Sequence, residues 1–353
     1  MVRNDNGERI NANMRKAYHI PTSIITGFLG AGKTTTINHL LAEKPATERW
    51  AVMVNEFGQI GVDATFIGRV AGVSIREIAG GCLCCTAGQA FEVALNRLIR
   101  DTSPDRIIIE PTGIGHPLKI IRTLTCGYYR DVLNLKATIC LVDARKLGES
   151  KYREHPAFQD QLNLADVLVG NKADCYSDID RSVFMELVNG SIPPKASYSM
   201  ISFGKVDSAL LDLPRDTSRI AGFPDAHPVR ELPFSIQDIQ EDSDEKAWIM
   251  NRESWVIHHR SGEGYCSGSW LIGADYCFDK SALSTLITSF PYTRVKGIMQ
   301  CYDGWLKING SDGLQELYDC EALESSRLEI IDTSPLPYQD IDRQLKKVLF
   351  SEC

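Results

Sequence analysis

The sequence predicts an α/β domain with a mostly parallel sheet and flanking helices, followed by a small α+β domain. Continuous β-branched runs, such as residues 107–109 and 167–169, are typical of strands buried on both faces. They alternate with helical patterns, as in residues 89–100, where apolar side chains recur on one face. After about residue 207 this alternation stops, and several strand patterns accompany one helical pattern. This order favours a parallel sheet first and a separate α+β unit second.

The composition changes along the chain predict four parts. Residues 1–18 are polar and are expected to form a flexible arm, and residues 19–210 carry the alternating pattern of the first domain. Proline-containing turns and an acidic run mark residues 211–252 as a linker. The α+β domain is expected at residues 253–340. Its strands are predicted at residues 254–259, 269–272, 293–300 and 305–308, with a helix at 281–289.

The overall charge and hydropathy exclude two classes of partner. The 353 residues have a net charge of −8, so they lack the basic footprint of a nucleic-acid-binding protein. No apolar run reaches the roughly 18 residues that a membrane span needs. The first twenty residues lack the apolar core of a signal peptide, so we expect a cytoplasmic protein without a nucleic-acid or membrane partner.

A glycine-rich segment predicts a phosphate-binding loop. Residues 27–34 read Gly-Phe-Leu-Gly-Ala-Gly-Lys-Thr, which fits the P-loop pattern between a strand at residues 19–26 and a helix at Lys33–Ala42. Glycines let backbone N–H groups converge on phosphate oxygens, and the helix dipole adds to the attraction. The lysine supplies charge to the β and γ phosphates, and the Thr34 hydroxyl ligates Mg²⁺. The predicted phosphate contacts are Gly27, Gly30, Ala31, Gly32, Lys33, Thr34 and Thr35.

A second motif predicts that the base is guanine. Asn171, Lys172 and Asp174 follow the strand pattern at residues 167–169, at the edge where parallel sheets bind ligands. A carboxylate accepts hydrogen bonds from N1–H and N2–H₂ of guanine, whereas adenine presents an acceptor at N1. The alternative is that Asp174 only caps a helix. Together with the phosphate-binding loop, the motif favours a P-loop GTPase.

Acidic residues near the phosphate-binding loop are candidates for hydrolysis. Glu110 ends the strand pattern at residues 107–109 and is predicted to organise Mg²⁺ and water, although a structural cap is the alternative. Gly113 would let a backbone N–H approach the γ phosphate. Asp63 is the choice for a second carboxylate linked to Mg²⁺, against an ordinary solvated loop carboxylate. His116 is a candidate metal ligand, with a structural role as the alternative.

Three of the eleven cysteines form a cluster: Cys82, Cys84 and Cys85 lie within four residues after Gly80-Gly81. Thiolates near a helix N-terminus bind soft metals well, and Zn²⁺ prefers four sulfur or nitrogen ligands. Three cysteines leave one position open, which suits metal transfer and which His116 or water would fill. A reactive dithiol and simple buried cysteines are the alternatives.

These segments occur in the order typical of CobW-like GTPases, which the chain resembles from about residue 21 to about residue 331. Residues 110–117, 204–207 and 294–297 look most similar to the YeiR-type zinc-binding GTPases of that family. The resemblance implies a zinc metallochaperone with GTP, Mg²⁺ and Zn²⁺ as its ligands. Hydrolysis would release zinc from the three cysteines to a zinc-dependent client protein. It also implies a regulatory C-terminal domain and a homo-oligomer that forms with zinc.

The sequence departs from many of these relatives in one respect. They carry a histidine-rich run between the domains, whereas the predicted linker here has only His227, with His258 and His259 further on. Zinc storage is therefore not expected, while a single switch site is. Two other functions remain open, a nucleotide-gated zinc sensor and a GTPase serving another metal such as cobalt for cobalamin synthesis, because cysteine ligands do not exclude those metals.

Overall fold

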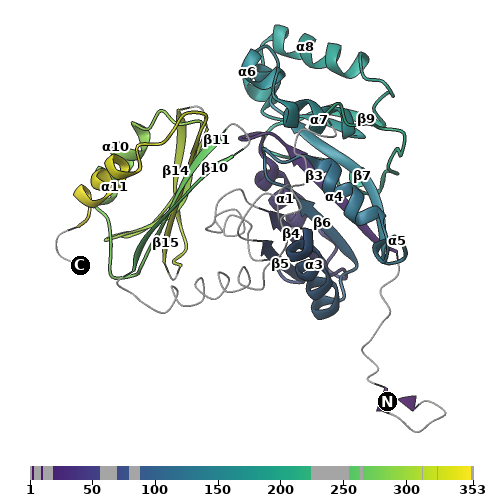
Figure 1. Ribbon diagram of the computed structural model, residues 1–353, viewed down its shortest axis with the longest axis horizontal. Helices are drawn as coiled ribbons and strands as arrows, with labels where there is room; N and C mark the ends of the chain where they lie inside the picture. Colours follow the sequence, from purple (N-terminus) through teal and green to yellow (C-terminus); the bar gives the residue numbers. More distant parts are fainter. Residues whose placement is uncertain are drawn as a thin grey trace, which may run out of the picture.

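The computed structural model describes residues 2–3, 9–10, 19–55, 70–78, 88–223, 254–262, 265–311, 313–323 and 325–350. Of the predicted N-terminal arm, it describes two short strands, β1 (Val2–Arg3) and β2 (Arg9–Ile10), which pair in antiparallel fashion. The rest of the described chain forms two sheets with their helices (Figure 1).

The first sheet is fully parallel and has seven strands in the order β5-β4-β6-β3-β7-β8-β9. The first strand, β3, is the central one. The chain then forms β4 and the edge strand β5, inserts β6 between β4 and β3, and adds β7, β8 and β9 on the other side. Ligands of such sheets bind where the strand order reverses, at the carboxyl ends of the strands. The strands are β3 (Ile20–Gly27), β4 (Trp50–Asn55), β5 (Val73–Ile78), β6 (Arg106–Glu110), β7 (Leu133–Val142), β8 (Val167–Gly170) and β9 (Ser197–Met200).

Helices cover both faces of this sheet because successive apolar residues of its strands point to opposite sides. On β6, Ile107 and Ile109 pack into the hydrophobic cluster under α3 and α4, whereas Ile108 packs into the cluster under α1. The prediction of strands buried on both faces is thereby confirmed. The helices are α1 (Lys33–Ala42), α3 (Gly88–Thr102), α4 (Pro117–Thr125), α5 (Tyr129–Val132), α6 (Ser150–Arg153), α7 (Pro156–Leu164), α8 (Asp178–Asn189), and the 3₁₀ turns η1 (Ala144–Lys146), η2 (Ala173–Cys175) and η3 (Ser208–Asp212).

The described start of the predicted linker packs against the first domain. The Ala137 N–H donates to the Leu213 carbonyl over 2.9 Å. Arg219 forms a buried ion pair with Asp166, with Nε 2.9 Å from Oδ1. The Gly222 N–H donates to Asp160 over 2.7 Å. The chain thus remains attached to the first domain at least as far as residue 222.

The second sheet is antiparallel, with six strands in the order β10-β11-β15-β12-β13-β14. Two helices pack on one face of it, where Leu283, Ile287, Ile341 and Leu345 meet a core that contains Trp270. The predicted α+β class is confirmed, and α11 is a second helix that extends past residue 340. The elements are β10 (Trp255–Gly262), β11 (Tyr265–Ile272), α10 (Lys280–Thr288), β12 (Arg294–Cys301), β13 (Gly304–Ser311), β14 (Leu314–Cys320), β15 (Ser326–Asp332) and α11 (Tyr338–Lys347).

None of the helices within the described ranges combines the length and the apolar character required to cross a membrane.

Candidate nucleotide site

The phosphate-binding loop joins β3 to α1 in a backbone conformation that depends on glycine. Gly27 has φ of 148° and Gly32 has φ of 96°, values that residues with a side chain rarely adopt. A Cβ at Gly27 would lie 3.1 Å from Cβ of Leu141 on the neighbouring strand β7. Gly32 is the N-cap of α1 and no side chain caps that end. The N–H groups of the first turn, which includes Thr34 and the exposed Thr35, therefore remain available for an anion.

Lys33 lies buried inside this loop. Its Nζ donates to the Gly27 carbonyl over 3.0 Å, which closes the loop on itself. Burial lowers the pKa of Lys33 to about 8, and the negative charge of Glu110 offsets only part of that effect. The ammonium has lost its hydrating water, and Glu110 compensates for only part of that loss. A phosphate placed beside it would therefore interact strongly.

Glu110 brings a carboxylate from the end of β6 to the first turn of α1. The Thr34 hydroxyl donates to its Oε1 over 3.2 Å. Its Oε2 is buried and accepts no hydrogen bond from the described residues. Burial raises the pKa of Glu110, while the charge of Lys33 and the hydrogen bond from Thr34 act in the opposite direction. A hydroxyl and a carboxylate with a spare oxygen are ligands that suit Mg²⁺.

The loop after β6 is held beside the phosphate-binding loop by two side chains of α7. A Cβ at Gly113 would lie 3.1 Å from Lys33 Nζ. The Gln161 amide donates to the carbonyls of Gly113 and Gly115 over 3.0 and 3.1 Å. His116 Nδ1 lies 3.0 Å from the fully buried Asp160 carboxylate. Asp160 and Gln161 were not singled out in the sequence, because nothing in a single polar pair on a helix reveals which loop it supports.

Asn171 connects the predicted base-binding loop to the phosphate-binding loop. Its side-chain N–H donates to the Ala31 carbonyl over 2.9 Å, and its Oδ1 accepts from the Gly204 N–H over 3.1 Å. Its own carbonyl lies within hydrogen-bond distance of the buried Tyr176 hydroxyl, whose single hydrogen is shared with the Val142 carbonyl 3.1 Å away. The Asn171 side chain therefore holds the base-binding loop to its neighbouring loops, and this determines the position of Asp174.

Asp174 is exposed at the tip of this loop. Its backbone N–H donates to the Ser202 hydroxyl over 3.0 Å. The pKa of Asp174 lies below its ordinary value because Ser202, and to a lesser extent Cys175, hydrogen-bond to the carboxylate. The group is therefore ionised at neutral pH and open to a base that presents two donors.

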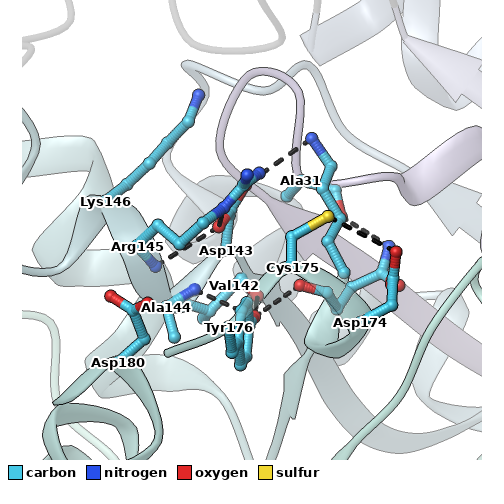
Figure 2. A network of polar contacts seen from close by, with 12 residues as sticks. Ala31, Val142, Asp143, Ala144, Arg145, Lys146, Asp174, Cys175, Tyr176 and Asp180 are labelled. Atoms are coloured by element: carbon cyan, nitrogen blue, oxygen red, sulfur yellow. Dashed lines mark hydrogen bonds and ion pairs between the residues drawn. The ribbon is translucent and has the colours of Figure 1, made fainter. Parts of the chain in front are cut away.

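A charged cluster that the sequence did not reveal lies next to Asp174 (Figure 2). The buried Asp143 follows β7, and its carboxylate lies 2.7 Å from Arg145 Nη2 and 3.5 Å from Lys172 Nζ. Burial alone would raise the pKa of Asp143, but the hydrogen bond from Arg145 and the nearby lysines hold it below its ordinary value. A carboxylate directly after the apolar run that forms the end of β7 was the available signal. The cluster anchors Lys172, whose φ is 66°.

The predicted residues Asp63, Cys82, Cys84 and Cys85 lie outside the described residues, so their positions relative to the site stay predictions. His116 is described, and its ring is buried against Asp160 rather than open to the surface. Among the described residues, no group of three or more His, Cys, Asp or Glu side chains could hold a metal ion. His258 and His259 lie on β10, where the ring of His259 packs 5.0 Å from that of Tyr338.

The fold and this loop set define a P-loop nucleotide-binding protein with a parallel α/β domain and an antiparallel second domain. Residues 21–198 match the family model described as CobW/HypB/UreG, nucleotide-binding domain, and the chain belongs to this family. It is 36% identical over 334 residues to the zinc chaperone YeiR of Escherichia coli (strain K12), which covers 93% of this chain and 97% of that relative.

Two further relatives are similar over about half of the chain. The zinc chaperone YjiA of Escherichia coli (strain K12) is 32% identical over 202 residues, or 54% of this chain and 60% of that protein. Zinc-regulated GTPase metalloprotein activator 1 of Schizosaccharomyces pombe (strain 972 / ATCC 24843) is 31% identical over 204 residues. That match covers 55% of this chain and 49% of the relative.

Proposed function

We propose that this protein is a zinc-binding GTPase that hydrolyses GTP to GDP and phosphate and couples hydrolysis to the transfer of zinc to a client protein. The observation that carries the GTPase part is that the partly buried Thr34 meets the buried Lys33 and Glu110 in one cluster. Asn171 ties this cluster to the loop that presents Asp174. The loops after β3, β6 and β8 therefore bring together a predicted phosphate-binding loop, a carboxylate oxygen without a hydrogen bond from the described residues, and a candidate guanine-binding carboxylate.

The residues present fit a bound Mg²⁺. Thr34 and Glu110 would hold the ion through oxygen ligands, and Glu110 Oε2 is a buried atom without a hydrogen bond from the described residues. When bound, Mg²⁺ neutralises phosphate charge that develops during hydrolysis. The protein itself contributes the backbone cradle, the Lys33 charge and the buried setting that excludes water.

The zinc part of the proposal rests on the cysteine motif and on the names of the relatives, two zinc chaperones and a zinc-regulated GTPase metalloprotein activator. Cys82, Cys84 and Cys85 would bind one Zn²⁺ as the transferred metal, with His116 as a candidate fourth ligand. β5 ends at Ile78 and α3 begins at Gly88, so in the sequence the cysteines lie between two elements of the nucleotide-binding domain. A cytoplasmic location and a zinc-dependent homo-oligomer belong to the same proposal.

The deciding experiment measures zinc affinity in the apo protein, with a non-hydrolysable GTP analogue and with GDP. A chaperone requires different values, because a nucleotide can shift metal binding only by its differential affinity for two states. We expect zinc dissociation constants below about 1 µM with the analogue, equivalent to about −8 kcal/mol, and weaker binding with GDP. Replacing Cys82, Cys84 and Cys85 by serine should abolish this binding and leave GTP binding intact.

The alternative functions are separated by that experiment together with a zinc-transfer assay and a metal competition. Zinc affinity that depends on the nucleotide without transfer to any client indicates a sensor. Tighter binding of cobalt or nickel in competition indicates a GTPase for another metal cofactor. Equal zinc affinity in the three nucleotide states removes the coupling on which a chaperone depends.

A further inference from the structure

The second sheet contacts the phosphate-binding loop at one end of its strands. The rings of Phe28, in the loop, and Tyr265, at the start of β11, have centroids 6.3 Å apart. Ile331 of β15 belongs to the same buried cluster as Phe28. A Cβ at Gly30 would lie 2.8 Å from the Ser311 hydroxyl at the end of β13. Figure 1 shows the β11 end of the second sheet beside β3, so the predicted phosphate cradle is also an interdomain contact.

Arg294 occupies the row of the second sheet that faces this contact. On β12 it lies opposite Ser311 of β13 and opposite Ile331 of β15. The next residue, Val295, packs into the core beneath the helices, so the alternation of strand side chains directs Arg294 to the other face. Arg294 is close enough for its positive charge to lower the pKa of both Lys33 and Glu110.

Two cations among the described residues act at the cradle. Lys33 is buried in the loop, and the charge of Arg294 reaches both Lys33 and Glu110. Lys33 and Glu110 are almost completely buried, so water screens them little. A guanidinium binds phosphate through two parallel N–H donors, which gives it an advantage over lysine at such a position.

We propose that Arg294 donates hydrogen bonds to the terminal phosphate of bound GTP, so that the second domain supplies a phosphate-contacting cation to the nucleotide site of the same chain. This inference rests on the proposed function. It makes the contact between the domains depend on the γ phosphate, because GDP leaves Arg294 without that partner. The second domain then distinguishes GTP from GDP directly, and the two sheets are coupled through one side chain.

The test uses the full-length protein with Mg²⁺, GDP and a non-hydrolysable GTP analogue. In Arg294→Ala we expect affinity for the analogue to fall about 10- to 100-fold, the range for loss of a charged hydrogen bond, while affinity for GDP changes less than about 2-fold. The turnover number for GTP should fall as well. Arg327→Ala is the matched control: Arg327 lies on the same face of β15 as Ile331, four residues and about 13 Å further along the strand.

A second variant keeps the test decisive if the alanine protein does not fold. Arg294→Lys retains the positive charge but lacks the two parallel N–H donors. We therefore expect its affinity for the GTP analogue to fall more than its affinity for GDP, by a smaller factor than in the alanine variant. Equal losses for GDP and the analogue, or none, overturn the role of Arg294. Wild-type protein that binds no guanine nucleotide overturns the proposed GTPase function instead, so the two failures are distinguishable.

Discussion

The two ends of the proposed nucleotide site differ in how their charged groups are solvated. At the phosphate end, Lys33 and Glu110 are buried, their pKa values are shifted by burial, and one carboxylate oxygen has no hydrogen bond from the described residues. At the base end, Asp174 is exposed and already hydrogen-bonded to Ser202. The phosphate end therefore holds buried charges that have lost their water, whereas the Asp174 carboxylate at the base end is solvated and hydrogen-bonded before a ligand binds. Substitutions should cost more at the phosphate end.

The largest effect is expected for Lys33→Ala. Removing the buried ammonium leaves Glu110 without its nearest described counter-charge and removes the cation that faces the phosphates. Affinity for GTP, measured by isothermal titration calorimetry, should fall about 100-fold or more, as expected for loss of more than one charged hydrogen bond. Lys205→Ala, at an exposed lysine, is the control. Near wild-type affinity in the Lys33 variant would remove the phosphate site from this loop.

Glu110→Gln is expected to separate binding from turnover. The amide oxygen can still accept from Thr34, but the charge that would organise Mg²⁺ and water is lost. Single-turnover hydrolysis should slow about 100-fold or more, a typical loss for one preorganised electrostatic group, while GTP affinity changes less than about 5-fold. The exposed Glu154→Gln provides the control. Unchanged turnover would show that Glu110 only caps the loop.

Asp174→Asn should have an intermediate effect that is confined to the base. One acceptor oxygen becomes a donor, so GTP affinity should fall about 10- to 100-fold. The ratio of GTP affinity to ATP affinity should decrease. Because Asp174 is exposed, the free energy of unfolding should change by less than about 0.5 kcal/mol. Asp178→Asn, in the first turn of α8, controls for the loss of a surface charge. Wild-type protein that binds GTP and ATP equally would refute the guanine assignment.

The smallest effect is expected for Ser202→Ala. It removes the hydroxyl that bonds to the Asp174 backbone and supports its carboxylate, but leaves the carboxylate itself in place. Because Ser202 only supports Asp174 and does not itself face the base, its loss should weaken GTP binding about 2- to 5-fold, or about 0.5–1 kcal/mol. The same substitution combined with Asp174→Asn should add little, because both act on one interaction. Full additivity in this double-mutant cycle would place Ser202 outside the base-binding contact.

Sequence reasoning worked best where one segment contains all the physical information. The predicted helix at Lys33–Ala42 and the strand at residues 107–109 depend on local periodicity, and both are found. The polar edge strands β9 and β14 were missed, because their side chains are only half-buried or exposed and no apolar run marks either strand. β15 was missed although it lies inside its sheet, since Glu329 interrupts its apolar pattern. Pairing with β11 and β12 on its two sides defines that strand.

The candidate site divides in a similar way. The motif residues Gly27, Lys33, Glu110 and Asn171 could be selected from the sequence, because each residue type has a recognisable chemical role. Their supports could not: Gln161 lies 48 residues from Gly113, and the link is a single hydrogen bond. Asp143, which pairs with Lys172, follows a different strand from the one that precedes the base-binding loop. Such contacts depend on strand order, which local patterns do not encode.

The class of this protein, its predicted phosphate-binding loop and its candidate guanine-binding loop follow from the sequence alone, because they depend on residue types at fixed spacing along a strand–loop–helix unit. Which groups come together at the buried phosphate end, and which domain reaches them, follow only from the folded chain. Arg294 lies more than 250 residues after Lys33 in the chain, yet its charge acts on Lys33 directly. The physical reason is that charge interactions depend on distance and burial in the folded chain, and neither follows from separation in sequence.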